Sequence, residues 1–283
     1  MVELAIDNGY RLIDGAWMYR TEPDVGKAVG NKIKSGVVKR EDIFIISKLW
    51  RTMHDPKDVP VAMERTLKDL GLKYVDSYLM HFPLASKKAA DEYEMVHLEE
   101  ADIPIEVTWK AMEKLVKLGY TKSVGLSNFN MSQIDRIVRD CEFFPVINEI
   151  EVNPFFHQKP LLDHCKQNGI QVVAYGAFYS PENPWLDPDI PSLITHATIK
   201  KLAKKHGKTP GQIIIRYLYQ IDCVPITKTN FIDHLVENIS AFENWNGLDN
   251  QDMKEMAQLN TGVRRFKFDK SKHFKEYPFT EDM

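Results

Sequence analysis

The sequence predicts an α/β fold, a (β/α)8 barrel of the TIM type, from three observations. Seven short apolar runs alternate along the chain with stretches whose apolar residues recur at helical spacing. The runs are apolar almost throughout, as expected for parallel strands that are covered on both faces. Polar residues gather where nearly every run ends, which is where barrel enzymes carry their chemistry. A doubly wound alternative is weaker, since no Gly-x-Gly-x-x-Gly follows an early strand.

The strand candidates share a β-type apolar composition, and polar residues lie at or near most of their C-terminal ends. They span residues 10–14, 43–49, 77–82, 123–127, 146–152, 172–176 and 223–228. A barrel of this type needs eight strands, and residues 2–9 have the pattern of the helix that would precede the strand ending at Asp14. We therefore expect a barrel that lacks its first β-strand in this chain.

Helices are predicted between the strands from apolar spacing and from capping residues. Apolar residues recur at helical spacing over 59–70, 109–116 and 134–138. Gly71 is a stop signal for the first of these helices. Thr209 followed by Pro210 predicts the start of another helix, and Asp249 is the expected cap of a helix over 250–259.

Two segments are predicted to be irregular. Residues 84–105 are long and charged and are expected to form a loop between a strand and a helix. The tail, residues 261–283, lacks clear periodicity and contains Phe266, Phe268, Phe274, Tyr277 and Phe279. Connections elsewhere are short and no low-complexity linker separates two parts, so we expect one domain over residues 1–283.

Composition excludes several classes of protein. The 283 residues are 43% hydrophobic and 27% charged, with a net charge of -3 and a pI of about 6.3. No basic excess points to nucleic acid, and the lysine pairs at 200–201 and 204–205 are expected to be solvated helix faces. Three cysteines without metal spacing suit a reducing compartment, and neither a signal peptide nor a membrane-spanning run is present. We therefore expect a cytoplasmic protein that binds no metal, membrane or nucleic acid.

Four residues at strand ends form a candidate set for proton transfer. Lys48 lies near the end of the apolar run 43–49, where a lysine is either paired with a carboxylate or placed for chemistry. Asp14 and His81 close two other runs, and Tyr19 follows Asp14 by five residues. Other interpretations remain open: Asp14 and Lys48 as a structural ion pair, Lys48 as a Schiff-base nucleophile, or His81 as a core residue.

Longer stretches around these residues resemble the aldo-keto reductase superfamily over nearly the whole chain. Residues 9–19, Gly-Tyr-Arg-Leu-Ile-Asp-Gly-Ala-Trp-Met-Tyr, are similar to a family signature, and residues 69–81 are similar to a second. Residues 125–130 and 226–229 look like further family blocks in the family's order. Residues 148–154 and 14–16 look weakly similar to insect members, some of which reduce ecdysteroid ketones. The resemblance implies reduction of aldehydes or ketones by NADP(H).

The resemblance also implies a role for each member of the proton-transfer set. Tyr19 matches the proton donor, and Lys48, Asp14 and His81 complete a tetrad. A free tyrosine has a pKa near ~10, and a neighbouring ammonium favours the phenolate. A carboxylate beside the lysine holds it charged, and a histidine can polarise the carbonyl oxygen.

Residues at later strand ends match the family's nicotinamide site. Ser127 and Asn128 match the pair that holds the carboxamide, Tyr175 the aromatic that stacks on the nicotinamide, and Ser180 a pyrophosphate contact. Glu149 stands where the family has a glutamine. A carboxylate accepts from the amide but donates only when protonated.

A last group matches the adenosine end of the cofactor. Lys228 and Thr229 match residues around the 2'-phosphate, while His234 stands where an arginine is usual and is only partly charged near neutrality. Glu237 and Asn238 match adenine contacts, although their spacing alone favours solvated helix residues.

The substrate pocket implied by the family is rimmed by aromatic residues, here Trp17, Trp50, Phe82 and the tail 261–283. Phe82 replaces a tryptophan found in many members, so the pocket should offer fewer hydrogen-bond donors. We expect a monomer that acts on a small, apolar carbonyl compound. Two alternatives are a catalytically idle, cofactor-binding member of the fold, such as a crystallin or a channel-accessory protein, and a Schiff-base lyase that uses Lys48.

Overall fold

The structure is a computed structural model that describes residues 1–179 and 192–280. It divides into two compact units. The N-terminal unit comprises residues 2–148 and the tail from Phe268, and the C-terminal unit comprises residues 149–267. The single domain over residues 1–283 stays a prediction. No helix in the described ranges is long and apolar enough to cross a membrane.

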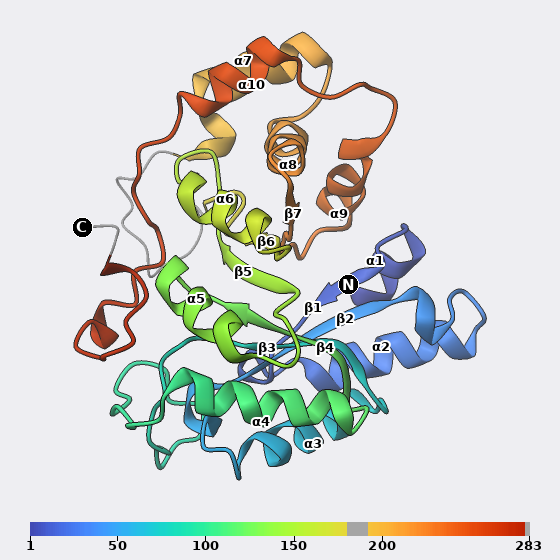
Figure 1. Ribbon diagram of the computed structural model, residues 1–283. Helices are drawn as coiled ribbons and strands as arrows, with labels where there is room; N and C mark the ends of the chain where they lie inside the picture. Colours follow the sequence, from blue (N-terminus) through green and yellow to red (C-terminus); the bar gives the residue numbers. More distant parts are fainter. Residues whose placement is uncertain (180–191, 281–283) are drawn as a thin grey trace. The chain divides into compact units, whose positions relative to one another are not determined.

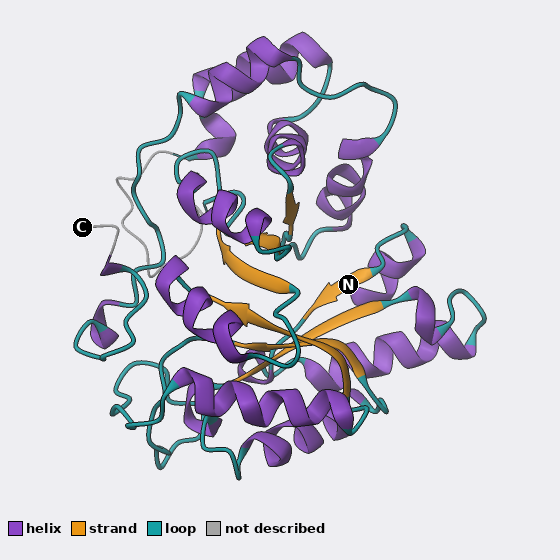
Figure 2. Cartoon of the chain, viewed as in Figure 1, coloured by secondary structure: helices purple, strands orange, loops and turns teal. Residues whose placement is uncertain are grey.

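All seven predicted strands are present, and they follow one another in the sheet in chain order (Figures 1 and 2). Their bounds are β1 Leu12–Asp14, β2 Phe44–Leu49, β3 Val75–Met80, β4 Thr121–Ser127, β5 Ile147–Glu151, β6 Gln171–Tyr175 and β7 Cys223–Pro225. The pairs β1–β2, β2–β3, β3–β4 and β6–β7 are parallel. The last strand was predicted to reach residue 228 but ends at Pro225, although the backbone N–H of Ile226 still donates to the carbonyl oxygen of Ala174 at 3.0 Å.

Helices of the N-terminal unit pack beside the sheet in chain order, α2 on α3, α3 on α4 and α4 on α5 (Figure 1). Their bounds are α1 Val2–Asp7, α2 Glu22–Lys34, α3 Val59–Leu70, α4 Ile105–Lys117 and α5 Met131–Asp140. Gly26 permits the close approach of α2 to α3, since a Cβ there would lie 2.1 Å from the carbonyl oxygen of Leu70. Gly71 ends α3 at φ 62°, as predicted.

The C-terminal unit contains five helices in its described residues, some with the predicted caps. They are α6 Lys159–Gln167, α7 Ala197–His206, α8 Pro210–Gln220, α9 Ile232–Ile239 and α10 Asn250–Ala257. Thr209 begins α8 by accepting the backbone N–H of Gln212, and Asp249 begins α10 by accepting that of Asp252. The lysines at 200–201 and 204–205 are exposed on α7, as predicted.

The remaining regular structure is six short 3-10 helices in the described residues. They are η1 Trp17–Tyr19, η2 Arg40–Asp42, η3 Arg51–Met53, η4 Leu193–Thr195, η5 Ser240–Phe242 and η6 Asp269–Ser271. The predicted loop after β3 is confirmed and contains one isolated bridge, between Ser86 and Glu100.

Residues 268–280 of the tail are fastened to helices of the N-terminal unit. Glu276 pairs with Arg136 at 2.8 Å, and Arg136 also pairs with Glu106 at 2.7 Å. The side chain of Asn130 donates to the carbonyl oxygen of Pro278 at 3.1 Å. This segment therefore has a defined path although its sequence shows no helical or strand period.

Candidate active site

Lys48 is at the centre of a polar cluster in the N-terminal unit. Its Nζ lies 2.5 Å from Oδ1 of Asp14 and 3.4 Å from the hydroxyl oxygen of Tyr19. It also donates to the carbonyl oxygen of Gly15 at 3.0 Å. In the parallel register Asp14 pairs with Ile46, two residues before Lys48, so both side chains leave the same face of the sheet.

The ion pair between Lys48 and Asp14 is largely buried. The Lys48 side chain is fully buried, and that of Asp14 is 14% exposed. An ammonium without a counter-charge would be costly in such a place, so the Asp14 carboxylate keeps Lys48 charged. Tyr19 is 45% exposed, and a small molecule can therefore reach its hydroxyl from outside while Lys48 holds it from within.

His81 follows the last residue of β3 and completes the cluster. Its ring lies edge-on to that of Tyr19, with the centroids 5.7 Å apart. Burial, and then the positive charges of Lys48 and Arg51, hold the pKa of His81 well below its usual range. The imidazole is therefore neutral at neutral pH, with one ring N–H available as a hydrogen-bond donor.

Ser127 and Asn128 lie at the end of β4 in the same unit, and both are buried. The amide nitrogen of Asn128 donates to the backbone oxygen of His81 at 3.0 Å and to Oγ of Ser127 at 3.0 Å. Asn128 has a left-handed backbone, φ 63°, which asparagine tolerates better than most residues. This polar pair is therefore joined directly to the backbone of the tetrad.

In the C-terminal unit, two predicted nicotinamide residues lie on neighbouring strands in the chain. Glu149 is buried in β5, and Tyr175 ends β6 and is half-buried. The Tyr175 ring packs edge-on against Phe266 at a centroid distance of 5.5 Å. Ser180 lies outside the described residues. Contact of these side chains with a cofactor stays a prediction.

The predicted phosphate residues lie on the segment between β7 and the first turns of α9. Lys228 and His234 are exposed, and Thr229 is half-buried and accepts the backbone N–H of Phe231 at 3.0 Å. An exposed ammonium on a backbone turn beside a helix start suits a phosphate group chemically.

The two predicted adenine contacts are not the solvated helix residues that their spacing favoured. Asn238 is buried and donates to Oγ1 of Thr227 at 3.2 Å. Glu237 is half-buried and accepts from Oγ1 of Thr209 at 2.5 Å. The Asn238 contact therefore ties α9 to the segment that carries Lys228, and the Glu237 contact ties α9 to the start of α8. The adenine contacts of both residues stay a prediction.

The three predicted pocket aromatics, Trp17, Trp50 and Phe82, are buried in one cluster of the N-terminal unit. Phe274 of the tail belongs to the same cluster, and Phe268 packs against Phe82 at a centroid distance of 4.7 Å. Trp50 also touches His81, with the ring centroids 5.3 Å apart. The structure thus brings residues 268–280 to these aromatics, and substrate contact stays a prediction.

Sequence reasoning missed several buried charged residues, among them Arg51 and Glu151. Arg51 directly follows Trp50, and Glu151 at the end of β5 accepts the backbone N–H groups of Arg265 and Phe266. Burial raises the pKa of Glu151. A signal for Glu151 was its position in an apolar run, whereas the charged loop that follows Arg51 gave no sign of its burial.

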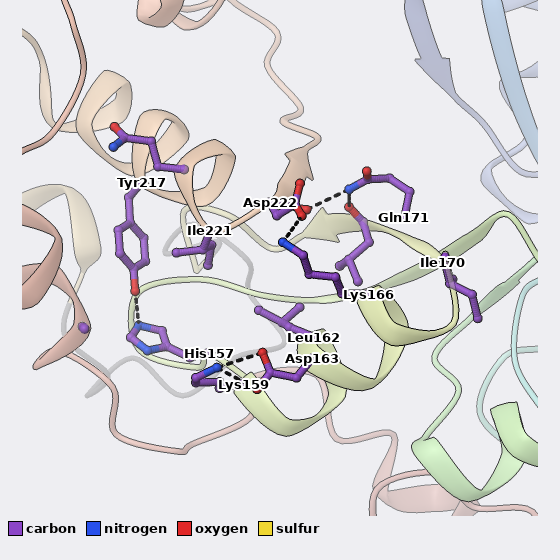
Figure 3. Close-up of a pocket in the computed structure, with 14 residues that line it drawn as sticks. His157, Lys159, Leu162, Asp163, Lys166, Ile170, Gln171, Tyr217, Ile221 and Asp222 are labelled. Carbon is purple, nitrogen blue, oxygen red and sulfur yellow. Dashed lines mark hydrogen bonds and ion pairs between the residues drawn. The ribbon is translucent and has the colours of Figure 1, made fainter. Parts of the chain in front are cut away.

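A cavity of about 600 Å³ lies elsewhere, between α6 and α8 of the C-terminal unit (Figure 3). The hydroxyl of Tyr217 meets His157 at 3.1 Å, and Lys166 pairs with Asp222 at 2.9 Å (Figure 3). These polar groups satisfy one another, and none of the predicted site residues lines this cavity.

The fold and the cluster define an α/β barrel with proton-transfer groups at the carboxyl ends of its strands. Residues 1–261 match the Aldo/keto reductase family. The chain is 40% identical over 288 residues to human Aldo-keto reductase family 1 member C1, covering 99% of this chain and 88% of the relative. It is 41% identical over 288 residues to prostaglandin-E(2) 9-reductase of Oryctolagus cuniculus, with the same coverage.

A solved structure shows the same fold. Bombyx mori aldo-keto reductase (AKR2E4), in complex with NADP, has a TM-score of 0.90 and 36% sequence identity, covering 98% of this chain and 87% of that chain. The chain belongs to the aldo/keto reductase family. The resemblance and the barrel class predicted from the sequence are confirmed.

Proposed function

We propose that this protein reduces aldehydes or ketones to alcohols with NADP(H), using Tyr19 as the proton donor. One observation carries the proposal. The buried ammonium of Lys48 lies between the Asp14 carboxylate and the accessible hydroxyl of Tyr19. An ammonium in that position favours loss of the phenolic proton.

The side chains present fit a nicotinamide dinucleotide phosphate. Ser127 and Asn128 offer hydroxyl and amide groups at a strand end, Tyr175 offers a half-buried aromatic ring, and Lys228 offers an exposed ammonium. Glu149 would accept from a carboxamide N–H without donating to its oxygen. When bound, the reduced cofactor supplies the hydride that adds to the carbonyl carbon.

The residues of this chain bind and protonate the carbonyl oxygen. The neutral His81 imidazole donates a hydrogen bond to it and orients it. Tyr19 transfers its proton to that oxygen as the carbon is reduced, and the phenolate left behind is stabilised by Lys48. Asp14 keeps Lys48 charged and aimed at Tyr19 throughout.

The environment of Lys48 disfavours the lyase alternative. A Schiff-base lysine must be neutral and reachable by a carbonyl compound, whereas Lys48 is fully buried and paired with Asp14. Borohydride trapping of a carbonyl compound on Lys48 would favour the lyase.

We further propose an apolar substrate, because Trp50, Phe82 and Phe268 gather beside His81. NADPH oxidation measured against aldehydes, quinones and steroid ketones tests the proposed function. Cofactor binding without turnover on any of them would favour an idle member of the fold.

A further inference from the structure

Arg51 is a buried cation with no counter-charge among the described residues. It begins η3, directly after Trp50 at the carboxyl end of β2, and is only 2% exposed. Over residues 1–179 and 192–280 it forms no ion pair. The contact its guanidinium makes is with the ring of Phe274, 4.8 Å from the ring centroid.

A buried, charged guanidinium without a counter-ion is expected to bind an anion. Burial lowers the pKa of Arg51 to about 10, so the group remains charged at neutral pH. An aromatic face compensates only part of the lost hydration of a guanidinium, and buried charges in proteins are normally paired.

The geometry of the unsatisfied atoms selects the kind of anion. Nε and Nη2 of Arg51 are both fully buried and without a hydrogen-bond partner in the described chain. Their N–H groups point the same way along one edge of the planar guanidinium, and two parallel donors match the two oxygens of a carboxylate. Lysine could not present such an edge.

Neighbouring groups are unsatisfied as well. Both ring nitrogens of His54 and Oγ of Ser86 are buried without partners in the described residues. Ser86 is tied to Arg51 because its backbone N–H donates to the Arg51 carbonyl oxygen at 2.9 Å. Burial and the charge of Arg51 lower the pKa of His54 to about 3, so its imidazole stays neutral and offers one N–H. His54 directly follows the short helix η3 that Arg51 begins, so its ring N–H is the candidate for a further donor to an anion held by Arg51.

Arg51 is also close to the proposed reaction centre. The ring of its neighbour Trp50 touches His81 at a centroid distance of 5.3 Å, and its charge acts on His81. A single small molecule could therefore place a carbonyl group at His81 and an acidic group at Arg51.

We propose that Arg51 binds the carboxylate of the substrate, so that this protein prefers carbonyl compounds with an apolar body and a carboxylate group. This inference rests on the proposed function for its reaction. The recognition of a carboxylate by Arg51 can be tested without turnover.

The first experiment compares matched substrates, 4-carboxybenzaldehyde and 4-formylbenzamide, which differ in charge and little in size. In the wild type, kcat/KM should favour the acid. Arg51→Met, which fills a similar volume without charge, should lower the ratio of the two kcat/KM values by about tenfold or more, as expected when a charge-assisted bidentate contact is lost. Arg51→Lys should recover only part of the ratio.

Arg139→Met is the matched control, because Arg139 is an exposed arginine on α5 whose removal changes the net charge equally. It should leave the ratio unchanged. An unchanged ratio in Arg51→Met, or an equal fall in the control, would overturn the assignment.

The second experiment uses benzoate and benzamide at equal ionic strength and follows thermal unfolding without substrate or cofactor. Benzoate should raise the unfolding midpoint of the wild type more than benzamide does, and Arg51→Met and Arg51→Lys should lose most of that difference. The absence of a benzoate effect in the wild type, or its survival in both variants, would refute the Arg51 site even in an active reductase. A benzoate effect that needs Arg51, in a protein without turnover, would refute the proposed reaction and leave the carboxylate site standing.

Discussion

The Nζ atom of Lys48 lies 2.5 Å from Oδ1 of Asp14, in a position where the lysine side chain is fully buried. This ion pair connects stability with chemistry. It keeps a charged ammonium inside the sheet, and the same ammonium reaches the hydroxyl of Tyr19 at 3.4 Å. Changes to either partner should therefore affect both unfolding and turnover.

Replacing Asp14 by Asn should destabilise the protein strongly. The change leaves Lys48 buried without a counter-charge, and the expected loss in the free energy of unfolding is about 3–5 kcal/mol, measured by urea denaturation. The double variant Asp14→Asn with Lys48→Met should be more stable than Asp14→Asn alone, although inactive, because it removes the stranded charge. If Asp14→Asn unfolds at the wild-type urea concentration, the pair has no stabilising role.

Tyr19→Phe should abolish carbonyl reduction and leave NADPH affinity almost unchanged. Loss of a positioned general acid should lower turnover by about 10²–10⁴-fold. Turnover is measured from NADPH oxidation, and affinity from fluorescence quenching. Tyr219→Phe, at an exposed tyrosine of α8, is the control and should behave as wild type. Wild-type turnover in Tyr19→Phe would rule out Tyr19 as the donor.

Ionisation of Glu22 should lower the free energy of unfolding as pH rises. Burial is the main cause that raises its pKa from 4.5 to about 7, only partly offset by the hydrogen bond from Ser47 at 2.6 Å. The folded protein therefore binds a proton that the unfolded chain releases, so this contribution is complete below pH ~4.5 and is lost as pH rises through about 7. Its full size is up to about 3 kcal/mol.

The measurement is the free energy of unfolding of wild type and Glu22→Gln between pH 5 and 8, in roughly unit steps. The lowered pKa values of His54 and His81 act in the opposite direction, and the difference between the two proteins removes their effect. The variant should gain stability relative to wild type as pH rises. Glu64→Gln, at an exposed position of α3, should show no such trend. A constant difference for Glu22→Gln would mean that Glu22 does not titrate in this range.

NADPH should bind more tightly than NADH, because the exposed ammonium of Lys228 can pair with the 2'-phosphate. Lys228→Met should reduce the ratio of the two affinities by roughly threefold to fivefold, as expected when one exposed charge pair is lost. His234→Arg, which adds a permanent planar cation on the same segment, should increase that ratio. Both affinities are measured by fluorescence quenching. An unchanged ratio in Lys228→Met would show that Lys228 does not meet the phosphate.

Phe268→Ala should lower kcat/KM for a bulky ketone more than kcat/KM for a small aldehyde. Phe268 packs on Phe82 beside the proposed reaction centre, and its loss removes apolar area that only a large substrate would cover. The ratio of kcat/KM for a steroid ketone to that for a small aldehyde should fall. Phe144→Ala, at an exposed phenylalanine before β5, serves as the control. An equal fall in kcat/KM for both substrates would show that Phe268 does not line the substrate pocket.

The sequence by itself determined the order and type of the strands and main helices. It also singled out Asp14, Tyr19, Lys48 and His81, four residues that the structure brings together and whose catalytic roles stay a prediction. Strand period, helix caps such as Thr209 and Asp249, and a lysine inside an apolar run are local signals, and the physics behind them acts within a few residues. The register between β1 and β2 is set by the same pattern, because a slip of one residue would turn Lys48 away from Asp14.

Only the tertiary structure decided which charged groups are buried and which residues they contact. Arg51 and Glu22 lie in segments whose sequences suggest solvent, and only long-range packing encloses them, Arg51 against Phe274 and Glu22 against Ser47. Asn238, whose spacing alone favoured a solvated helix face, is likewise buried, and its side-chain amide donates to Thr227. Burial depends on residues far away in the chain, and the electrostatic consequences of burial arise only when those residues come together.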